Sequence, residues 1–343
     1  MLSRCLKLLA FLFLLSACSA DREVARSFYY WNKDFKLRTE DENLLKSLGN
    51  ERIYLRCFSL EWNRPQKSVQ IADAVSLQAG MLPEFQEIVP VVHIGQDFFT
   101  HIKPEQVEQI ATSLMSRVDS IAVAGNFSFS EIQVDFKWNE QSRDLYFALL
   151  NSIKAALSPV EQKLSCSIRL QQVQFPEITG IPPVDRGMLL YYNIGKINEP
   201  GTRNSIYDPD VAARYVSYIK TYRLPLDIAL PVFTWAVHQR NGEVLSVIQN
   251  ITLDDVRNSG LFEEKAKGLF APLKTCDFKG SWFKEGDRLR VEEISPGRSL
   301  RAARQVKPFL PEGVSSVALF YLDSVNTSRY GQEAFEELYS VFE

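Results

Sequence analysis

The chain has 343 residues, of which 24% are charged and 12% are aromatic, and its formal net charge is −3. An acidic balance argues against nucleic-acid binding, which favours basic surfaces. The length allows two small domains or one large α/β barrel. The aromatic content suits a large core or a binding site that is lined with rings.

The first segment of the chain has the features of an export signal. Arg4 and Lys7 precede an apolar run at residues 8–15, which is far shorter than the roughly 20 residues that a transmembrane helix needs. The run ends in Leu15-Ser16-Ala17-Cys18, which resembles a bacterial lipobox, where cleavage precedes the cysteine and the thiol carries a diacylglyceryl group. We therefore expect a signal peptide at residues 1–17, lipidation at Cys18 and a tether at residues 18–26, with secretion after cleavage at Ala20 as the alternative.

Export places the protein in the bacterial cell envelope, with membrane contact through the lipid anchor. Residues 1–17 contain two basic residues and no acidic one, so their removal shifts the net charge from −3 to −5. Ser19 follows the predicted lipidation site in place of an aspartate that often retains lipoproteins at the inner membrane, which favours the outer membrane. Beyond the signal, no apolar stretch in the sequence is long enough to span a bilayer.

Runs rich in β-branched and aromatic residues predict eight strands, at residues 27–31, 52–60, 87–95, 131–138, 163–170, 186–194, 224–235 and 316–324. Helical periodicity lies between several of them, at residues 42–48, 104–118, 140–157 and 209–222. Strands that alternate with helices imply parallel βαβ units. Eight such units predict a single α/β domain over residues 27–343, a (β/α)8 TIM-type barrel, rather than an open doubly wound sheet.

The connections are not all regular. Residues 171–185 carry no clear helix, and the segment after Leu60 has little helical pattern. The stretch between strands seven and eight is too long for one helix; within it, residues 269–275 and 288–293 predict strands and residues 299–306 a helix. We interpret residues 236–315 as an inserted β-hairpin region.

Alternation along the fourth strand separates its side chains into two faces. The apolar set, Ile132, Val134, Phe136 and Trp138, is expected to meet the helices, and the polar set, Glu131, Gln133, Asp135 and Lys137, to face the interior. The same test predicts interior positions on the other strands for Arg56, His93, Arg169, Gln171, Tyr191, Asn193, Trp235, Tyr321 and Asp323. Because barrel enzymes keep functional groups at the carboxyl ends of strands, we expect a pocket there. The alternative is a set of ion pairs that only stabilise the barrel.

Glycoside hydrolysis is a reaction that this set of residues suggests. It uses two carboxylates roughly 5 to 10 Å apart, and Asp135 is the best candidate, with Asp323 or Glu61 as its partner. Positively charged side chains would tune the carboxyl pKa values and hold polar or anionic groups such as a uronate. The predicted substrate-binding residues are Arg56, His93, Lys137, Arg169, Gln171, Tyr191, Asn193, Trp235 and Tyr321.

The sequence predicts neither a metal site nor a cofactor. It contains three histidines and no Cys-x-x-Cys spacing. Cys57 and Cys166 lie in strand-like runs and are interpreted as small buried hydrophobic residues. The alternative for an exported protein is a disulfide between two of Cys57, Cys166 and Cys276.

Two resemblances extend this interpretation. The segment Glu131-Ile132-Gln133-Val134-Asp135-Phe136-Lys137-Trp138 resembles the fourth strand of glycoside hydrolase barrels related to the chitinase-like group. That group has the pattern Asp-x-x-Asp-x-Asp-x-Glu, whose terminal glutamate donates the proton. Asp135 matches the last aspartate, whereas Lys137 stands at the position of the proton donor and Gln133 at that of another aspartate.

The chain is also similar to a family of lipid-anchored barrel proteins from Bacteroides-type bacteria. The segments that carry this likeness are Phe28-Tyr29-Tyr30-Trp31, Pro182-Pro183-Val184-Asp185-Arg186-Gly187-Met188 and Tyr321-Leu322-Asp323-Ser324. We therefore predict an envelope lipoprotein whose barrel binds or hydrolyses a carbohydrate at its carboxyl-end face. The alternatives are a non-catalytic glycan-binding or scaffold lipoprotein, which Lys137 favours, and an assembly partner that acts through residues 236–315.

Overall fold

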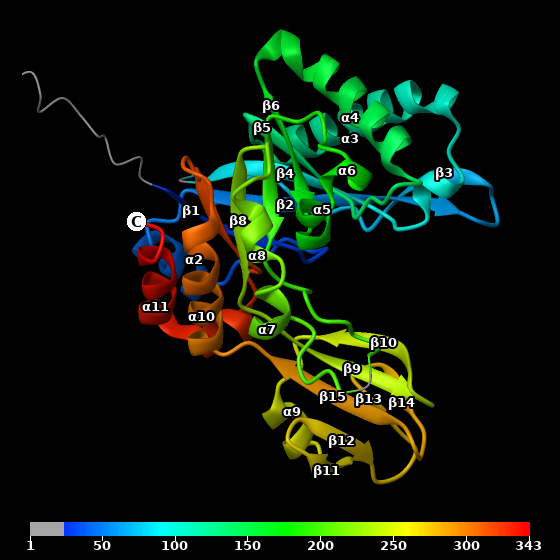
Figure 1. Ribbon diagram of the computed structural model, residues 1–343, viewed down its shortest axis with the longest axis vertical. Coiled ribbons are helices and arrows are strands. Elements are labelled where there is room, and N and C mark those ends of the chain that lie inside the picture. Colours follow the sequence, from blue (N-terminus) through cyan, green and yellow to red (C-terminus); the bar gives the residue numbers. More distant parts are fainter. Residues whose placement is uncertain (1–23, 85, 200) are drawn as a thin grey trace, which may run out of the picture.

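The computed structural model describes residues 24–84, 86–199 and 201–343 (Figure 1). Within these residues, eight parallel strands form a sheet that closes on itself, because β1 pairs with both β16 and β2. The strands are β1 (Ala25–Tyr30), β2 (Arg52–Asn63), β4 (Glu87–Ile94), β5 (Glu131–Asp135), β6 (Lys163–Ile168), β7 (Arg186–Leu190), β8 (Leu226–Pro231) and β16 (Ser316–Phe320). The predicted (β/α)8 TIM-type barrel is confirmed, and each strand lies within or overlaps a predicted one.

The predicted export features fall outside this part of the chain. The signal peptide, Cys18 and most of the tether lie before residue 24, where the description begins. In the described ranges, no helix combines the length and the apolar character that crossing a membrane requires.

Helices surround the barrel (Figure 1). The longer ones are α2 (Thr39–Ser47), α3 (Val107–Gly125), α4 (Arg143–Leu157), α10 (Pro296–Val306) and α11 (Ser324–Ser340). Helices α3 and α4 pack together through apolar faces with three- and four-residue spacing, such as Leu114 and Val118 on α3 and Leu150 and Ile153 on α4. The α3 helix ends where Asn126 adopts a left-handed conformation with φ 54°.

Shorter elements replace a full helix at the connections that lack helical periodicity. After β2 the chain turns back as β3 (Ser68–Ala72), which pairs antiparallel with β2. Between β6 and β7 lie α5 (Leu170–Gln174) and α6 (Pro176–Thr179). The helix predicted at residues 209–222 is present as two single turns, α7 (Pro209–Ala212) and α8 (Val216–Ile219). The single-turn 3₁₀ helices are η2 (Phe98–Thr100), η3 (Pro104–Gln106), η4 (Ser158–Val160) and η5 (Lys307–Phe309).

The insertion between β8 and α10 is larger than the predicted hairpin. Its strands are β9 (Thr234–Arg240), β10 (Glu243–Gln249), β11 (Phe262–Ala266), β12 (Leu269–Pro272), β13 (Cys276–Phe278), β14 (Ser281–Phe283) and β15 (Arg288–Glu293), and its helix is α9 (Leu253–Asn258). Five strands form a sheet in the order β10-β9-β15-β12-β11, and β13 pairs with β14. The two predicted strands pair antiparallel as β12 and β15. The insertion has its own hydrophobic core, centred on residues such as Phe270 and Phe283.

The alternation predicted for β5 is correct. Phe136 and Trp138 contact Tyr146 of α4, with ring centroids 5.1 and 5.3 Å apart, so their face meets the helices. On the other face, Gln133 accepts a hydrogen bond at 2.5 Å from the hydroxyl of Tyr29, which comes from β1 across the interior. The polar side of β5 therefore faces the inside of the barrel.

Candidate functional site

The carboxylate of Asp135 lies at the carboxyl end of β5, among side chains of the neighbouring strands. Its Oδ2 is 2.9 Å from Nδ1 of His93 on β4. Its Oδ1 accepts hydrogen bonds from Oγ of Ser167 on β6 at 2.5 Å and from Nη2 of Arg169 at 3.1 Å. Asp135 is 6% exposed. Three strands thus converge on one carboxylate, as the strand register requires for residues at the same level of the barrel.

This environment keeps Asp135 ionised. Burial opposes the ionisation of its carboxyl, but the positive charge of Arg169 and the hydrogen bonds of His93 and Ser167 outweigh that effect, so the pKa of Asp135 is lowered well below its usual range. An ionised carboxylate can only accept hydrogen bonds. Asp135 is therefore suited to hold its neighbours in place and unsuited to donate a proton.

A cavity of about 460 Å³ opens directly above Asp135 at the mouth of the barrel. Among the described residues that line it, Asp135 is the only acidic one. Aromatic rings form much of its wall: Trp31, Tyr192, Phe233, Trp235, Phe320 and Tyr321. Tyr192 stacks on Phe320 with ring centroids 4.8 Å apart, and Trp31 lies edge-on to Phe320 at 5.4 Å. We call this set of rings the aromatic cup.

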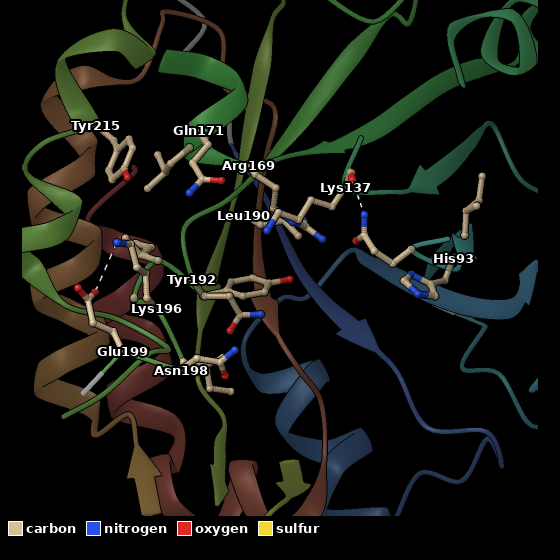
Figure 2. Close-up of a pocket in the computed structure, with 17 residues that line it drawn as sticks. His93, Lys137, Arg169, Gln171, Leu190, Tyr192, Lys196, Asn198, Glu199 and Tyr215 are labelled. Carbon is tan, nitrogen blue, oxygen red and sulfur yellow. Dashed lines mark hydrogen bonds and ion pairs between the residues drawn. The ribbon is translucent and has the colours of Figure 1, made fainter. Parts of the chain in front are cut away.

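A second cavity of about 740 Å³ adjoins the first (Figure 2). Arg169, Leu190, Tyr192 and Asn193 line both. The second is bounded by His93 and the exposed Lys137 on one side and by residues 194–199 on the other, where Lys196 and Glu199 form an ion pair at 3.6 Å. The carboxyl-end face of the barrel therefore has two adjacent cavities.

Most of the predicted site residues meet at these cavities. Arg56 lies over the ring of Trp31, 5.7 Å from its centroid, and pairs with Asp73 at 3.1 Å. The hydroxyl of Tyr321 donates to Oδ1 of Asn250 at 2.7 Å. The predicted residues that line one or both cavities are Arg56, His93, Asp135, Lys137, Arg169, Gln171, Asn193, Trp235 and Tyr321.

The interior position predicted for Tyr191 is wrong. Its hydroxyl donates to Oε1 of Gln305 on α10 at 2.9 Å, so the side chain belongs to the helix layer, and Tyr192 faces the cavities instead. Tyr191 and Tyr192 directly follow β7, and both faces of the strand predicted at residues 186–194 are largely apolar, which removes the contrast on which the strand-parity argument depends.

The two predicted carboxylate partners of Asp135 lie elsewhere. Asp323 caps the N-terminus of α11, where Oδ1 accepts from the backbone N–H of Val325 at 2.9 Å and Oδ2 accepts from Nδ2 of Asn32 at 3.2 Å. Glu61 lies on β2 opposite Gln70 of β3. Neither side chain lines either of the two cavities. The catalytic roles of Asp135, Asp323 and Glu61 stay predictions.

The sequence did not reveal several lining residues. Lys33 and Lys196 lie on connecting segments, where no periodicity indicates which side chains face a pocket. The cysteines take no part in the site. Cys57, Cys166 and Cys276 are buried free thiols, and burial raises the pKa of Cys57 to about 12. Over the described ranges, no three His, Cys, Asp or Glu side chains are grouped so that they could hold a metal ion.

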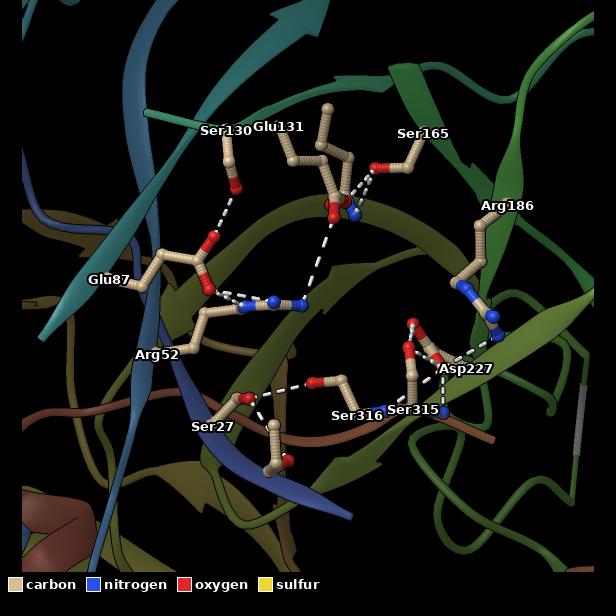
Figure 3. A network of polar contacts seen from close by, with 12 residues as sticks. Ser27, Arg52, Glu87, Ser130, Glu131, Ser165, Arg186, Asp227, Ser315 and Ser316 are labelled. Atoms are coloured by element: carbon tan, nitrogen blue, oxygen red, sulfur yellow. Dashed lines mark hydrogen bonds and ion pairs between the residues drawn. The ribbon is translucent and has the colours of Figure 1, made fainter. Parts of the chain in front are cut away.

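The opposite, amino-terminal end of the barrel carries a separate polar network (Figure 3). Oε1 of Glu131 accepts from Oγ of Ser165 at 2.5 Å, and Arg52 lies between Glu131, at 3.8 Å, and Glu87, at 2.7 Å. Asp227 accepts from the backbone N–H groups of Ser315 and Ser316. Burial is the main cause that raises the pKa values of Glu131 and Asp227. Since barrel active sites occur at the carboxyl end, this network is structural.

Comparison with solved structures identifies the architecture. No family model matches the chain, and no curated protein matches it by sequence. The GH18 chitinase ChiB from the chitin utilization locus of Flavobacterium johnsoniae superposes with a TM-score of 0.55 at 10% identity, over 94% of each chain. The spore cortex-lytic enzyme SleL of Bacillus megaterium superposes with a TM-score of 0.55 at 12% identity, over 92% of this chain and 74% of its own. The chain therefore has the fold of the chitinase-like (β/α)8 barrels.

A class V chitinase from Nicotiana tobaccum, solved in complex with NAG4, matches the same chitinase-like barrel with a TM-score of 0.50 at 12% identity, over 93% of this chain and all of its own. At these identities the likeness concerns the fold alone. The resemblance of β5 to the chitinase-like fourth strand therefore extends to the architecture of most of the chain.

We expect Glu131→Gln to leave the protein at least as stable as the wild type at pH 7. Because burial raises the pKa of Glu131, the stability associated with its protonated form is present at low pH and lost as the pH rises through the folded-state pKa. Glutamine keeps an acceptor for Ser165 without the buried charge. Urea unfolding should show a more favourable effect of the substitution at pH 7 than at pH 4. If the substitution lowered the free energy of unfolding by more than about 1 kcal/mol at pH 7, the attraction of Glu131 to Arg52 would outweigh the cost of burying its charge.

Asp135→Asn is expected to lower the free energy of unfolding at pH 7 by about 3 kcal/mol, because it leaves Arg169 without its buried partner. Asp323→Asn is the matched control: asparagine caps a helix as well as aspartate, so a change within about 0.5 kcal/mol is expected. Equal effects of the two substitutions would contradict the structural importance given to Asp135.

A comparison of the wild type with Asp135→Asn at different pH values tests the ionisation of Asp135. Its pKa is lowered in the folded state, so the stability due to its ionisation is fully present above the unfolded-state value of about 4 and is lost as the pH falls further. Urea unfolding from pH 7 down to about pH 2 should therefore show a steeper acid loss for the wild type than for Asp135→Asn. Parallel curves would show that the carboxylate gains nothing from its neighbours.

Proposed function

We propose that the barrel binds a carbohydrate at its carboxyl-end mouth and does not hydrolyse it. We also propose that the protein is lipid-anchored in the bacterial cell envelope, with the outer membrane favoured over the inner one. The anchor and its location rest on the sequence of residues 1–18. Binding of a sugar is supported by the chitinase-like barrel and by the aromatic cup, because aromatic rings offer flat apolar faces beside polar groups that can orient hydroxyls.

The observation that supports the absence of hydrolysis is the ionisation of Asp135. Glycoside hydrolysis requires a carboxyl group that donates a proton to the leaving oxygen. Among the described residues of the mouth cavity, Asp135 is the only acidic one, and Arg169, His93 and Ser167 keep it ionised. Lys137 stands two residues further on, at the position of the proton donor in the resembled group, and an amine cannot replace a carboxylic acid there.

Two guanidinium groups of the mouth cavity are within reach of a ligand. The side chain of Arg169 is 24% exposed and that of Arg56 is 15% exposed, and both line the cavity. Their N–H groups can donate hydrogen bonds to a sugar hydroxyl or carbonyl oxygen. With the rings of Trp31 and Trp235 beside them, these donors fit a neutral oligosaccharide of the N-acetylglucosamine type.

The experiment that tests this proposal is titration of the full chain with tetra-N-acetylchitotetraose by isothermal titration calorimetry, followed by mass spectrometry of the same sugar after prolonged incubation. We expect saturable binding and an intact sugar. Release of shorter sugars at a rate above the protein-free control would overturn the non-hydrolytic part. Absence of binding by this sugar and by soluble peptidoglycan fragments would overturn the binding part.

Trp31→Ala and Trp235→Ala are each expected to weaken this binding by about tenfold, because each removes a ring of the cup. Trp282→Ala is the matched control, since Trp282 is 57% exposed on β14 and lines neither barrel cavity. Thermal melting of each variant reports whether it remains folded. If all three tryptophan variants bound the sugar equally, the aromatic cup would not be its binding site.

A further inference from the structure

A third large cavity, of about 870 Å³, lies outside the barrel mouth. One wall is the inserted sheet, from which Gln239 of β9, Leu269 of β12 and Arg288 of β15 contribute. The other walls are the segment that follows β7, around residues 201–204, and the first turn of α10. Figure 1 shows the chain after β7 passing beside β9 and β15. Asn204 anchors it there by donating to the backbone carbonyl of Glu293 at 3.1 Å.

The walls of this cavity are strongly positive. They contain five cationic side chains, Arg203, Lys267, Arg288, Arg290 and Arg298, and two acidic ones, Glu199 and Glu293. Both acids are near cations that do not line the cavity: Glu199 pairs with Lys196 at 3.6 Å, and Glu293 lies 3.9 Å from Arg329. Arg290 is held by the buried Glu292 at 2.7 Å.

The other four cations have no such compensation. Within the described residues, no carboxylate lies within ion-pair distance of Arg203, Lys267, Arg288 or Arg298, although the whole chain has a net charge of −3. Cationic side chains that surround one cavity repel one another and attract an anion. The local charge of these walls is therefore opposite in sign to the net charge of the chain.

The start of α10 adds to this field. Ser295 caps the helix, and its first turn contains no acidic residue and one cation, Arg298. The N-terminus of a helix carries partial positive charge and is normally flanked by acidic side chains. A cation at this position is electrostatically less favourable than an acidic residue, and an anion bound beside Arg298 would remove that repulsion.

We propose that this cavity is a second binding site, which takes a small molecule or a glycan substituent carrying an oxyanion, either a carboxylate or a phosphate. The guanidinium groups of Arg288 and Arg298 supply the paired donors that match such groups, and Lys267 adds a point charge. The apolar side chains of Leu253 and Leu269 give the uncharged part of the ligand a surface to contact. This site does not depend on carbohydrate binding at the barrel mouth.

The test is calorimetric titration of the full chain with inorganic phosphate and, separately, with trigalacturonate, at constant ionic strength set with sodium chloride. Saturable binding of at least one probe is expected. Tighter binding of trigalacturonate would identify an acidic glycan as the ligand class, and binding of phosphate alone a phosphorylated one. No saturable binding of either probe would overturn the proposal.

Arg288→Ala and Arg298→Ala are each expected to weaken binding of the probe by about tenfold or more. Lys274→Ala, at an exposed lysine of the insertion outside the cavity, is the control and should bind as the wild type does. If an arginine variant fails to fold, the exposed Lys267→Ala replaces it. Variants that bind the probe as tightly as the wild type would overturn the proposal. All of these cavity variants should bind tetra-N-acetylchitotetraose as the wild type does, which keeps this test distinct from that of the barrel mouth.

Discussion

The carboxylate of Asp135 can remain buried and charged inside the barrel only because three neighbouring side chains compensate for the lost water. His93, Ser167 and Arg169 reach it from β4 and from the end of β6, within 2.5 to 3.1 Å. An isolated buried carboxylate would lose several kcal/mol of free energy or take up a proton. The positions of these strands and the ionised state of Asp135 thus depend on one another.

That mutual dependence also limits the chemistry of the site. A carboxylate that is engaged by an arginine, a histidine and a serine is held in its ionised form and is a poor proton donor. What is left for a ligand is the aromatic cup and the partly exposed guanidinium groups of Arg56 and Arg169. The proposed function depends on these elements of recognition.

The insertion extends the binding surface beyond the barrel. Trp235 of β9 lines the mouth cavity, and Gln239 of the same strand lines the positive cavity. These two residues are four positions apart on one extended strand, about 13 Å, so β9 contributes to both proposed sites. The two sites differ in chemistry: the first is aromatic and holds a compensated charge, and the second is cationic and uncompensated.

The sequence alone determined the barrel and the orientation of β5, because helical periodicity lies between several of the eight apolar runs and because β5 has one wholly apolar and one wholly polar face. It predicted that Tyr191 rather than Tyr192 faces the interior, which is wrong, since both faces of the strand predicted at residues 186–194 are largely apolar and give no contrast. It could not show that Asp323 caps α11. The positive cavity joins residues near 203, 267, 288 and 298, which are distant in the chain. Side-chain alternation is a local property that a sequence displays, whereas the partners of a charge depend on which distant segments the folded chain brings within a few ångströms.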